Sequence, residues 1–420
     1  MAIWLRNVVI ADPRSGIKGT KTGIFINNGR IVSFSRPEHL PEGTEEWDAE
    51  GCFVAPGFTD VFSHFCDPGL EFKETLETGA MAAAAGGFTR AFAIPNTKPP
   101  IDSKSQVEYI INKSLRLPVE IIPLGSITRG CEGKELAEMY DMWQSGARAF
   151  SDGTHSLQNS QVLTKALQYV KALDAAIVQI PNEESLSKNG LIHEGVVSTR
   201  LGLPGKPELA ENLMLNRDIE LLRYTGSRLH VTGVSTAKSV EQIRRAKEEG
   251  LKISASVSPY HLHFTDEDLH TYDTNLKVNP PLRSAKDVEA LREGLRSGII
   301  DLVASHHQPH EWDSKTCEFE YARYGMEGLE STVAAAHSAL EFNAEKIAEL
   351  FALAPAKIFN LHLPEIKEGA EAMLTLFSLG DTYPFAQDQI RSASKNNAFI
   401  GSSFNLKIAG IIRNNHYYKS

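Results

Sequence analysis

The sequence predicts an α/β protein, a parallel (β/α)8 barrel with a small β domain built from both ends of the chain. Two observations lead to this prediction. Eight apolar runs rich in β-branched and aromatic residues alternate with helix-like stretches through the middle of the chain, which is the pattern of repeated strand–helix units. Each end of the chain also carries several short strand-like runs, and within each end no helical pattern separates these runs. A doubly wound open sheet is the alternative, but no glycine-rich dinucleotide loop is present.

Length, charge and cysteine spacing narrow the classes of function. The 420 residues suffice for one large domain with a smaller companion. A net charge of −10 argues against a nucleic-acid surface, which needs clustered lysine and arginine. No apolar run approaches the ~20 residues that span a bilayer, and the N-terminus lacks a signal-peptide pattern. The four cysteines form no CxxC pair, so we expect a cytoplasmic protein that binds neither membranes nor nucleic acids.

The predicted barrel covers residues 52–365. Its eight strand-like runs are Gly57–Phe65, Phe88–Asn96, Val119–Thr128, Ala147–Asp152, Ala175–Pro181, Ser227–Ser235, Lys252–Leu262 and Ile299–His307. Amphipathic helical patterns such as Lys134–Gln144 and Ser239–Glu249 lie between them and stop at glycine. The longest loop-like region, Asn182–Glu208, is a candidate to lie over the barrel mouth.

The predicted β domain combines residues 1–51 with residues 366–420. Its strands are Trp4–Ile10, Thr22–Ile26, Arg30–Phe34, Met373–Ser378, Leu406–Ile412 and His416–Tyr418. An Asn28-Gly29 step signals a tight hairpin between the second and third of these. We expect the two ends to pair as one small β-sandwich, and two unrelated β extensions are the alternative.

Several segments resemble dihydroorotase, a family of the amidohydrolase superfamily. They are Glu71–Gly79, Gly86–Thr89, Pro95–Thr97, His193–Gly195, Arg200–Gly205, Val278–Arg283 and Gly328–Glu330. The resemblance covers nearly the whole chain. It implies an amidohydrolase-type barrel and descent from enzymes that interconvert carbamoyl-aspartate and dihydroorotate in pyrimidine synthesis. Their chemistry takes place at the carboxyl ends of the barrel strands.

At three positions where the resemblance implies a histidine metal ligand, this chain has another residue. Phe62 replaces the first histidine of a His-x-His pair whose second member is His64. Ile180 and Gly233 stand where histidines follow strands 5 and 6. Phenylalanine, isoleucine and glycine have no side-chain donor for a metal. A family-type binuclear zinc site, which needs about three protein ligands per metal, is therefore not expected.

Other positions of the implied site have also changed. His306 stands where the family places an aspartate that serves as metal ligand and general base, and Asp152 is followed by Gly153 instead of a second aspartate. Cys66 occupies the place of an arginine that grips the substrate carboxylate, and a thiol cannot replace that bidentate contact.

Two sets of residues remain as candidates. His64, Asp152 and His306 are the remaining metal candidates, so we expect no cofactor or at most one zinc. The other interpretation is that they are leftover polar residues bonded to one another. Asn96, Asn279 and His310 stand where the family's other substrate contacts stand, although each also fits a purely structural role in a turn or loop.

Three functions are compatible with these residues. The first is a catalytically impaired or inactive dihydroorotase homologue that acts as a structural or regulatory subunit. The resemblance suggests a homodimer and aspartate carbamoyltransferase as its partner. The second is an active dihydroorotase or related cyclic amidohydrolase with a reduced, mononuclear metal site. The third is a small-molecule binder that uses Asn96, Asn279 and His310.

Overall fold

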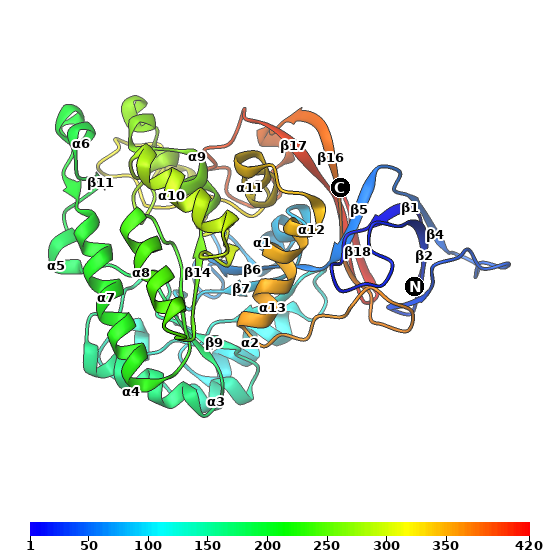
Figure 1. The fold of residues 1–420 in the computed structure, drawn as a ribbon, viewed down its shortest axis with the longest axis horizontal. Coiled ribbons are helices and arrows are strands. Elements are labelled where there is room, and N and C mark those ends of the chain that lie inside the picture. Colours follow the sequence, from blue (N-terminus) through cyan, green and yellow to red (C-terminus); the bar gives the residue numbers. More distant parts are fainter.

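The computed structural model describes all 420 residues. A larger part in which helices surround parallel strands lies beside a β-rich part that contains both termini (Figure 1). No helix combines the length and the apolar character needed to cross a membrane.

The β-rich part is one eight-stranded sheet. Its strands are β1 (Ala2–Ile10), β2 (Lys21–Asn27), β3 (Arg30–Ser33), β4 (Glu45–Asp48), β5 (Cys52–Pro56), β16 (Met373–Pro384), β17 (Ser403–Arg413) and β18 (His416–Lys419). They run in the order β18-β17-β16-β5-β1-β2-β3, and β4 pairs with β1. The strands from the two ends therefore meet where β5 pairs with β16 and β1. The expected sandwich is a single hydrogen-bonded sheet, and β5, at the start of the predicted barrel range, belongs to it.

The barrel strands form two parallel arcs. One arc is β6 (Phe58–Ser63), β7 (Phe88–Ala93) and β8 (Glu120–Pro123), and the other is β9 (Ala149–Phe150), β10 (Ala176–Gln179), β13 (Leu229–Val231), β14 (Ile253–Val257) and β15 (Leu302–Val303). Parallel bridges between Gly125 and Phe150 and between Ser63 and His307 join the arcs at both edges. The eight strands thus form a closed ring, and each lies inside one of the predicted runs.

Helices connect the strands and cover the ring. They are α1 (Leu76–Ala85), α2 (Lys104–Ser114), α3 (Met139–Gln144), α4 (Ser160–Lys171), α7 (Glu208–Thr225), α8 (Ala237–Glu248), α10 (Ala285–Arg296) and α11 (Thr332–Leu340). A last helical segment runs through α12 (Ala344–Ala348), a π-helical turn (Glu349–Leu353) and α13 (Ala354–Ile358).

Three local predictions differ from the structure. The helix predicted from Lys134 begins only at Met139, because Leu136 forms a bridge with Thr128 instead. The strand predicted to reach Leu262 ends at Val257, and Pro259 then opens a short helix, α9 (Pro259–His263). The region 182–208 has its own elements, namely α5 (Glu184–Ser187), β11 (Ile192–His193), α6 (Val196–Leu201) and β12 (Gly205–Lys206).

A separate apolar cluster includes residues at the carboxyl ends of the barrel strands. It includes Phe62 from β6, Ile94 after β7 and Ile180 after β10, each no more than 3% exposed. The space around these strand ends is therefore partly filled by hydrocarbon. The cluster continues through the barrel interior to Phe359, which follows α13.

Candidate functional site at the barrel mouth

A cavity of about 500 Å³ opens at the carboxyl ends of the strands. Its lining residues are Phe62, Leu70, Lys73, Ile94, Lys98, Thr154, His155, Ile180, Asn279, His306, His307, Gln308, His310, Arg323 and Tyr324. No aspartate or glutamate is among them, whereas three side chains carry a fixed positive charge. The cavity is therefore suited electrostatically to an anion.

The structure divides the predicted site residues into two groups. Asn279, His306 and His310 line the cavity, whereas His64, Asn96 and Asp152 do not. The three predicted metal candidates, His64, Asp152 and His306, are thus not gathered at one point.

His306 is held inside the mouth as a neutral ring. Its Nε2 lies 2.8 Å from Thr232 Oγ1, and its ring stacks on Phe62 with 4.7 Å between centroids. Burial, together with the nearby His261 and His230, lowers the pKa of His306 to about 3. The Nε2 that a metal or substrate proton would need is already hydrogen-bonded.

The His306 ring also fills the space beside Gly233. A Cβ atom at residue 233 would lie 2.9 Å from His306 Cε1, and the φ of Gly233 is +70°. A side chain at residue 233 and the His306 ring in its present position therefore exclude each other. Gly233 and His306 are both positions where this chain differs from the pattern that the family resemblance implies, and this contact connects the two differences.

Asp152 is used to hold a loop. Its Oδ1 accepts hydrogen bonds from the amides of Ile127 and Thr128, each at 2.9 Å, and its Oδ2 accepts one from Thr128 Oγ1 at 2.6 Å. Burial raises the pKa of Asp152 despite these hydrogen bonds. The carboxylate thus joins the ends of β8 and β9 and does not face the cavity.

Asn96 connects the segment after β7 with the loop after β9 and with His64, which follows β6. The Asn96 side chain donates to the Asp152 carbonyl at 3.1 Å and accepts from the Thr154 amide at 3.0 Å. The Asn96 carbonyl lies 3.0 Å from His64 Nε2, and burial lowers the pKa of His64 to about 3. A Cβ atom at Gly153 would lie 1.7 Å from Asn96 Oδ1, so the Asn96 amide occupies the space that a second aspartate needs.

The residues at the mouth do not fit a family-type metal group. No set of three or more His, Cys, Asp or Glu side chains is placed to hold a metal ion. Phe62 and Ile180 project hydrocarbon into the mouth, and the three remaining donors bond to protein groups. Cys66 is buried, and burial raises the pKa of its thiol, so it does not supply a thiolate at neutral pH.

Asn279 and His310 contact cationic side chains at the cavity wall. Lys206 Nζ donates to Asn279 Oδ1 at 2.7 Å, and burial, aided by Arg283, lowers the pKa of Lys206 to about 8. His310 Nε2 lies 2.8 Å from the Tyr324 carbonyl, and its Nδ1 lies 3.4 Å from Lys73 Nζ. Both residues therefore lie beside positive charge at the cavity wall.

The cationic residues of the mouth were missed from the sequence. Lys98 follows directly after Pro95-Asn96-Thr97, so its place next to a strand end was a usable signal. Arg323 lies in a loop and Lys206 ends β12, both far along the chain from Lys98, and no local pattern indicates that they approach the mouth.

Comparisons with known proteins place this chain in the amidohydrolase class. The profile described as "Amidohydrolase family" matches residues 186–415, and the one described as "Dihydro-orotase-like" matches residues 51–239. The chain is 37% identical to the dihydroorotase of Syntrophus aciditrophicus over 97% of both chains. It is 41% identical to that of Carboxydothermus hydrogenoformans over 96% of this chain and 94% of the relative. The chain belongs to the dihydroorotase family.

Solved structures of similar fold include two hydantoinases. L-hydantoinase (dihydropyrimidinase) from Arthrobacter aurescens matches with a TM-score of 0.86 at 23% identity, covering 100% of this chain and 96% of that one. D-hydantoinase (dihydropyrimidinase) from a Thermus species matches with a TM-score of 0.82 at 19% identity, covering 100% and 97%. These likenesses support the barrel with an accompanying β-rich part.

Proposed function

We propose that this chain acts in pyrimidine synthesis as a member of the dihydroorotase family. The support is its similarity, at 37% identity or above, to relatives named dihydroorotase along almost their full length. The fold alone does not decide between a catalytic and a non-catalytic role, so the mouth has to be considered separately.

We further propose that the chain does not carry out the family's metal-dependent hydrolysis. One observation carries this proposal: the candidate donors at the strand ends bond to protein groups, while Phe62 and Ile180 fill part of the mouth. Metal-assisted hydrolysis needs a metal to activate water and to polarise the scissile carbonyl. Without a matching donor set, the barrel serves as a structural or regulatory subunit.

Aspartate carbamoyltransferase is the partner that we propose for this subunit, alongside self-association as a homodimer. Size-exclusion chromatography of the chain mixed with the carbamoyltransferase of the same organism tests the pairing. Co-elution with a rise in carbamoyltransferase activity is the expected result. Separate elution of a lone homodimer, with no change in that activity, would contradict it.

An active dihydroorotase is the second candidate, and the names of the curated relatives favour it over the first. For an active enzyme with one zinc, His64, Asp152 and His306 would have to converge on a single point. That movement would break the hydrogen bonds that now hold each side chain. Metal content measured beside dihydroorotate turnover separates the two candidates.

The cavity supports binding of a carboxylate ligand in either case. We expect millimolar dihydroorotate or carbamoyl-aspartate to raise the melting temperature, because a ligand that binds only the folded state stabilises it. Lys98→Gln should weaken the affinity about tenfold through loss of a charge-assisted contact. Lys286→Gln, which changes an exposed lysine on α10, is the matched control. An unchanged melting temperature with both ligands would exclude this role.

A further inference from the structure

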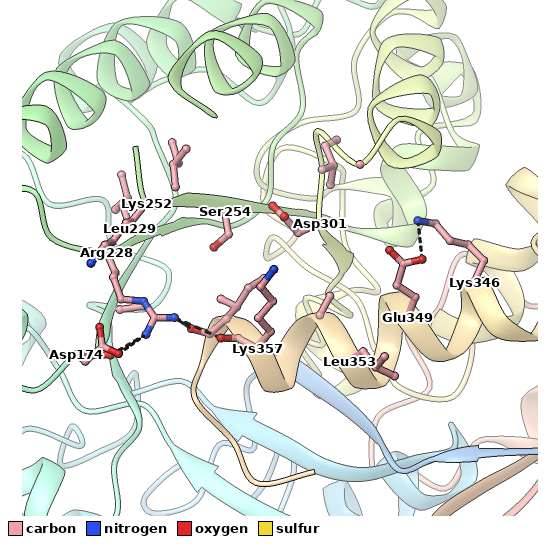
Figure 2. Close-up of a pocket in the computed structure, with 16 residues that line it drawn as sticks. Asp174, Arg228, Leu229, Lys252, Ser254, Asp301, Lys346, Glu349, Leu353 and Lys357 are labelled. Atoms are coloured by element: carbon pink, nitrogen blue, oxygen red, sulfur yellow. Dashed lines mark hydrogen bonds and ion pairs between the residues drawn. The ribbon is translucent and has the colours of Figure 1, made fainter. Parts of the chain in front are cut away.

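Figure 2 shows a second cavity, whose volume is about 580 Å³. It lies at the end of the barrel opposite the mouth. Its walls come from the amino ends of the strands: Leu229 begins β13, Ile253 begins β14, and Asp301 directly precedes β15. The volume is in the range of small-molecule sites. Because barrel chemistry takes place at the carboxyl ends, this cavity is separate from the mouth described above.

The cavity is roofed by the last helical segment of the barrel. Glu349, Leu353, Ala354 and Lys357 face it from the π-helical turn and α13. A π-helical turn interrupts the regular helix where it passes over the cavity, and such turns are frequent at functional sites.

The walls provide an apolar surface. Leu229, Ile253 and Ile300 are almost completely buried and line the cavity together with Leu353 and Ile358. Leu353 and Ile358 are only partly buried, so an apolar body of a ligand would gain free energy mainly by covering these two side chains.

The carboxylates at the cavity are already paired with cations. Asp174 Oδ2 lies 3.1 Å from Arg228 Nη1, and Glu349 Oε2 lies 3.1 Å from Lys346 Nζ. Figure 2 shows both pairs. Asp301, at 2.7 Å from Lys247 Nζ, also accepts a hydrogen bond from the Ala255 amide at 2.8 Å.

Two lysines at the cavity have no such partner. The Lys252 and Lys357 ammonium groups form no hydrogen bond or ion pair, although both residues line the cavity. In Figure 2 Lys357 extends from the roof helix toward the strand ends that carry Ser254 and Asp301. Neither ammonium group is held by a direct contact. Burial raises the pKa of Asp301, and Lys357 lies near enough to that carboxylate to favour its charged form and so to oppose the rise. The paired carboxylates offer no free site for a cation.

The histidine beside the cavity argues for binding and against a second catalytic centre. Ser254 Oγ lies 2.9 Å from His230 Nδ1, which resembles a serine–histidine pair. His230 Nε2, however, lies 3.1 Å from Ser256 Oγ, and no carboxylate bonds to the ring. Burial lowers the pKa of His230 to about 3. Both ring nitrogens are thus bonded to serine hydroxyls, and the carboxylate that orients the histidine of a catalytic triad is missing.

We propose that this cavity binds a small organic anion, a carboxylate or phosphate monoester attached to an apolar body. The anionic group contacts Lys252 and Lys357, and the apolar body lies against the strand ends and the roof helix. The site is independent of the function proposed for the barrel mouth.

Isothermal titration of the full chain with phenyl phosphate, hexanoate and inorganic phosphate tests this site. At least one of the two organic anions is expected to bind, and which one binds identifies the anionic group. Lys357→Gln and Lys252→Gln should each weaken that binding about tenfold. Lys286→Gln, at an exposed position on α10 away from both cavities, should leave it unchanged.

Three results would overturn the proposal. The first is that neither organic anion binds at millimolar concentration. The second is that inorganic phosphate binds as tightly as the organic anions. The third is that Lys98→Gln weakens the binding while Lys357→Gln and Lys252→Gln do not. Melting temperatures of the ligand-free variants show whether each remains folded, so that a loss of binding is not confused with a loss of structure.

Discussion

Glu211→Ala is expected to lower the free energy of unfolding by about 3–5 kcal/mol, the usual cost of removing one partner from a buried ion pair. Glu211 lies on α7, and its Oε2 is 3.7 Å from Arg283 Nη2, with both side chains only 2% exposed. Its Oε1 accepts hydrogen bonds from the amides of Ser235 at 3.0 Å and Thr236 at 3.2 Å. The variant leaves a buried guanidinium and two amides without this acceptor.

Urea denaturation measures this effect, with Glu220→Ala as the control on the same helix. Glu220 is exposed and pairs only with Arg223, so its removal should leave the denaturation midpoint nearly unchanged. Equal midpoints for the two variants would show that Glu211 does not hold α7 to the loop after β13, the loop that also carries Gly233.

Gly153→Asp, which restores the residue pattern implied by the family, is expected to cost about 2–4 kcal/mol of folding free energy. Two causes add together. The φ of residue 153 is +64°, which disfavours a side chain, and the new Cβ would lie 1.7 Å from Asn96 Oδ1. The added variant Asn96→Gly should recover the steric part of this loss.

Gly250→Asp is the matched control for Gly153→Asp. Gly250 also has a positive φ, +79°, but no atom lies within 4 Å of the position of its Cβ. It should therefore carry the backbone cost without the clash. If denaturant titrations give equal losses for both variants, the Asn96 side chain does not compete for the space of a second aspartate.

The sequence predicted the ring of strands well because each barrel strand is an apolar run. Elements set by tertiary contacts were harder to predict. Pro259 and the residues after it continue an apolar pattern, yet they form α9. Leu136 has helical spacing, but its bridge to Thr128 keeps the chain extended until Met139.

The sequence predicted those residues of the candidate site whose location follows from their place at the end of a barrel strand or in the loop after it. Asn279, His306 and His310 line one cavity because barrel topology brings the strand ends together. The directions of the Asn96 and Asp152 side chains depend on amides of neighbouring loops, which the sequence does not indicate. Lys206 reaches Asn279 across 73 residues of chain, and only the folded structure shows this contact.

The central claim is that the chain does not carry out metal-dependent hydrolysis. The most direct test measures zinc content and dihydroorotate turnover on the same preparation, purified without a metal-binding tag. The strand-end geometry predicts well below one zinc per chain, and no turnover in the presence of added zinc. Zinc at one or two ions per chain together with turnover would contradict that prediction, and would establish the chain as an active dihydroorotase.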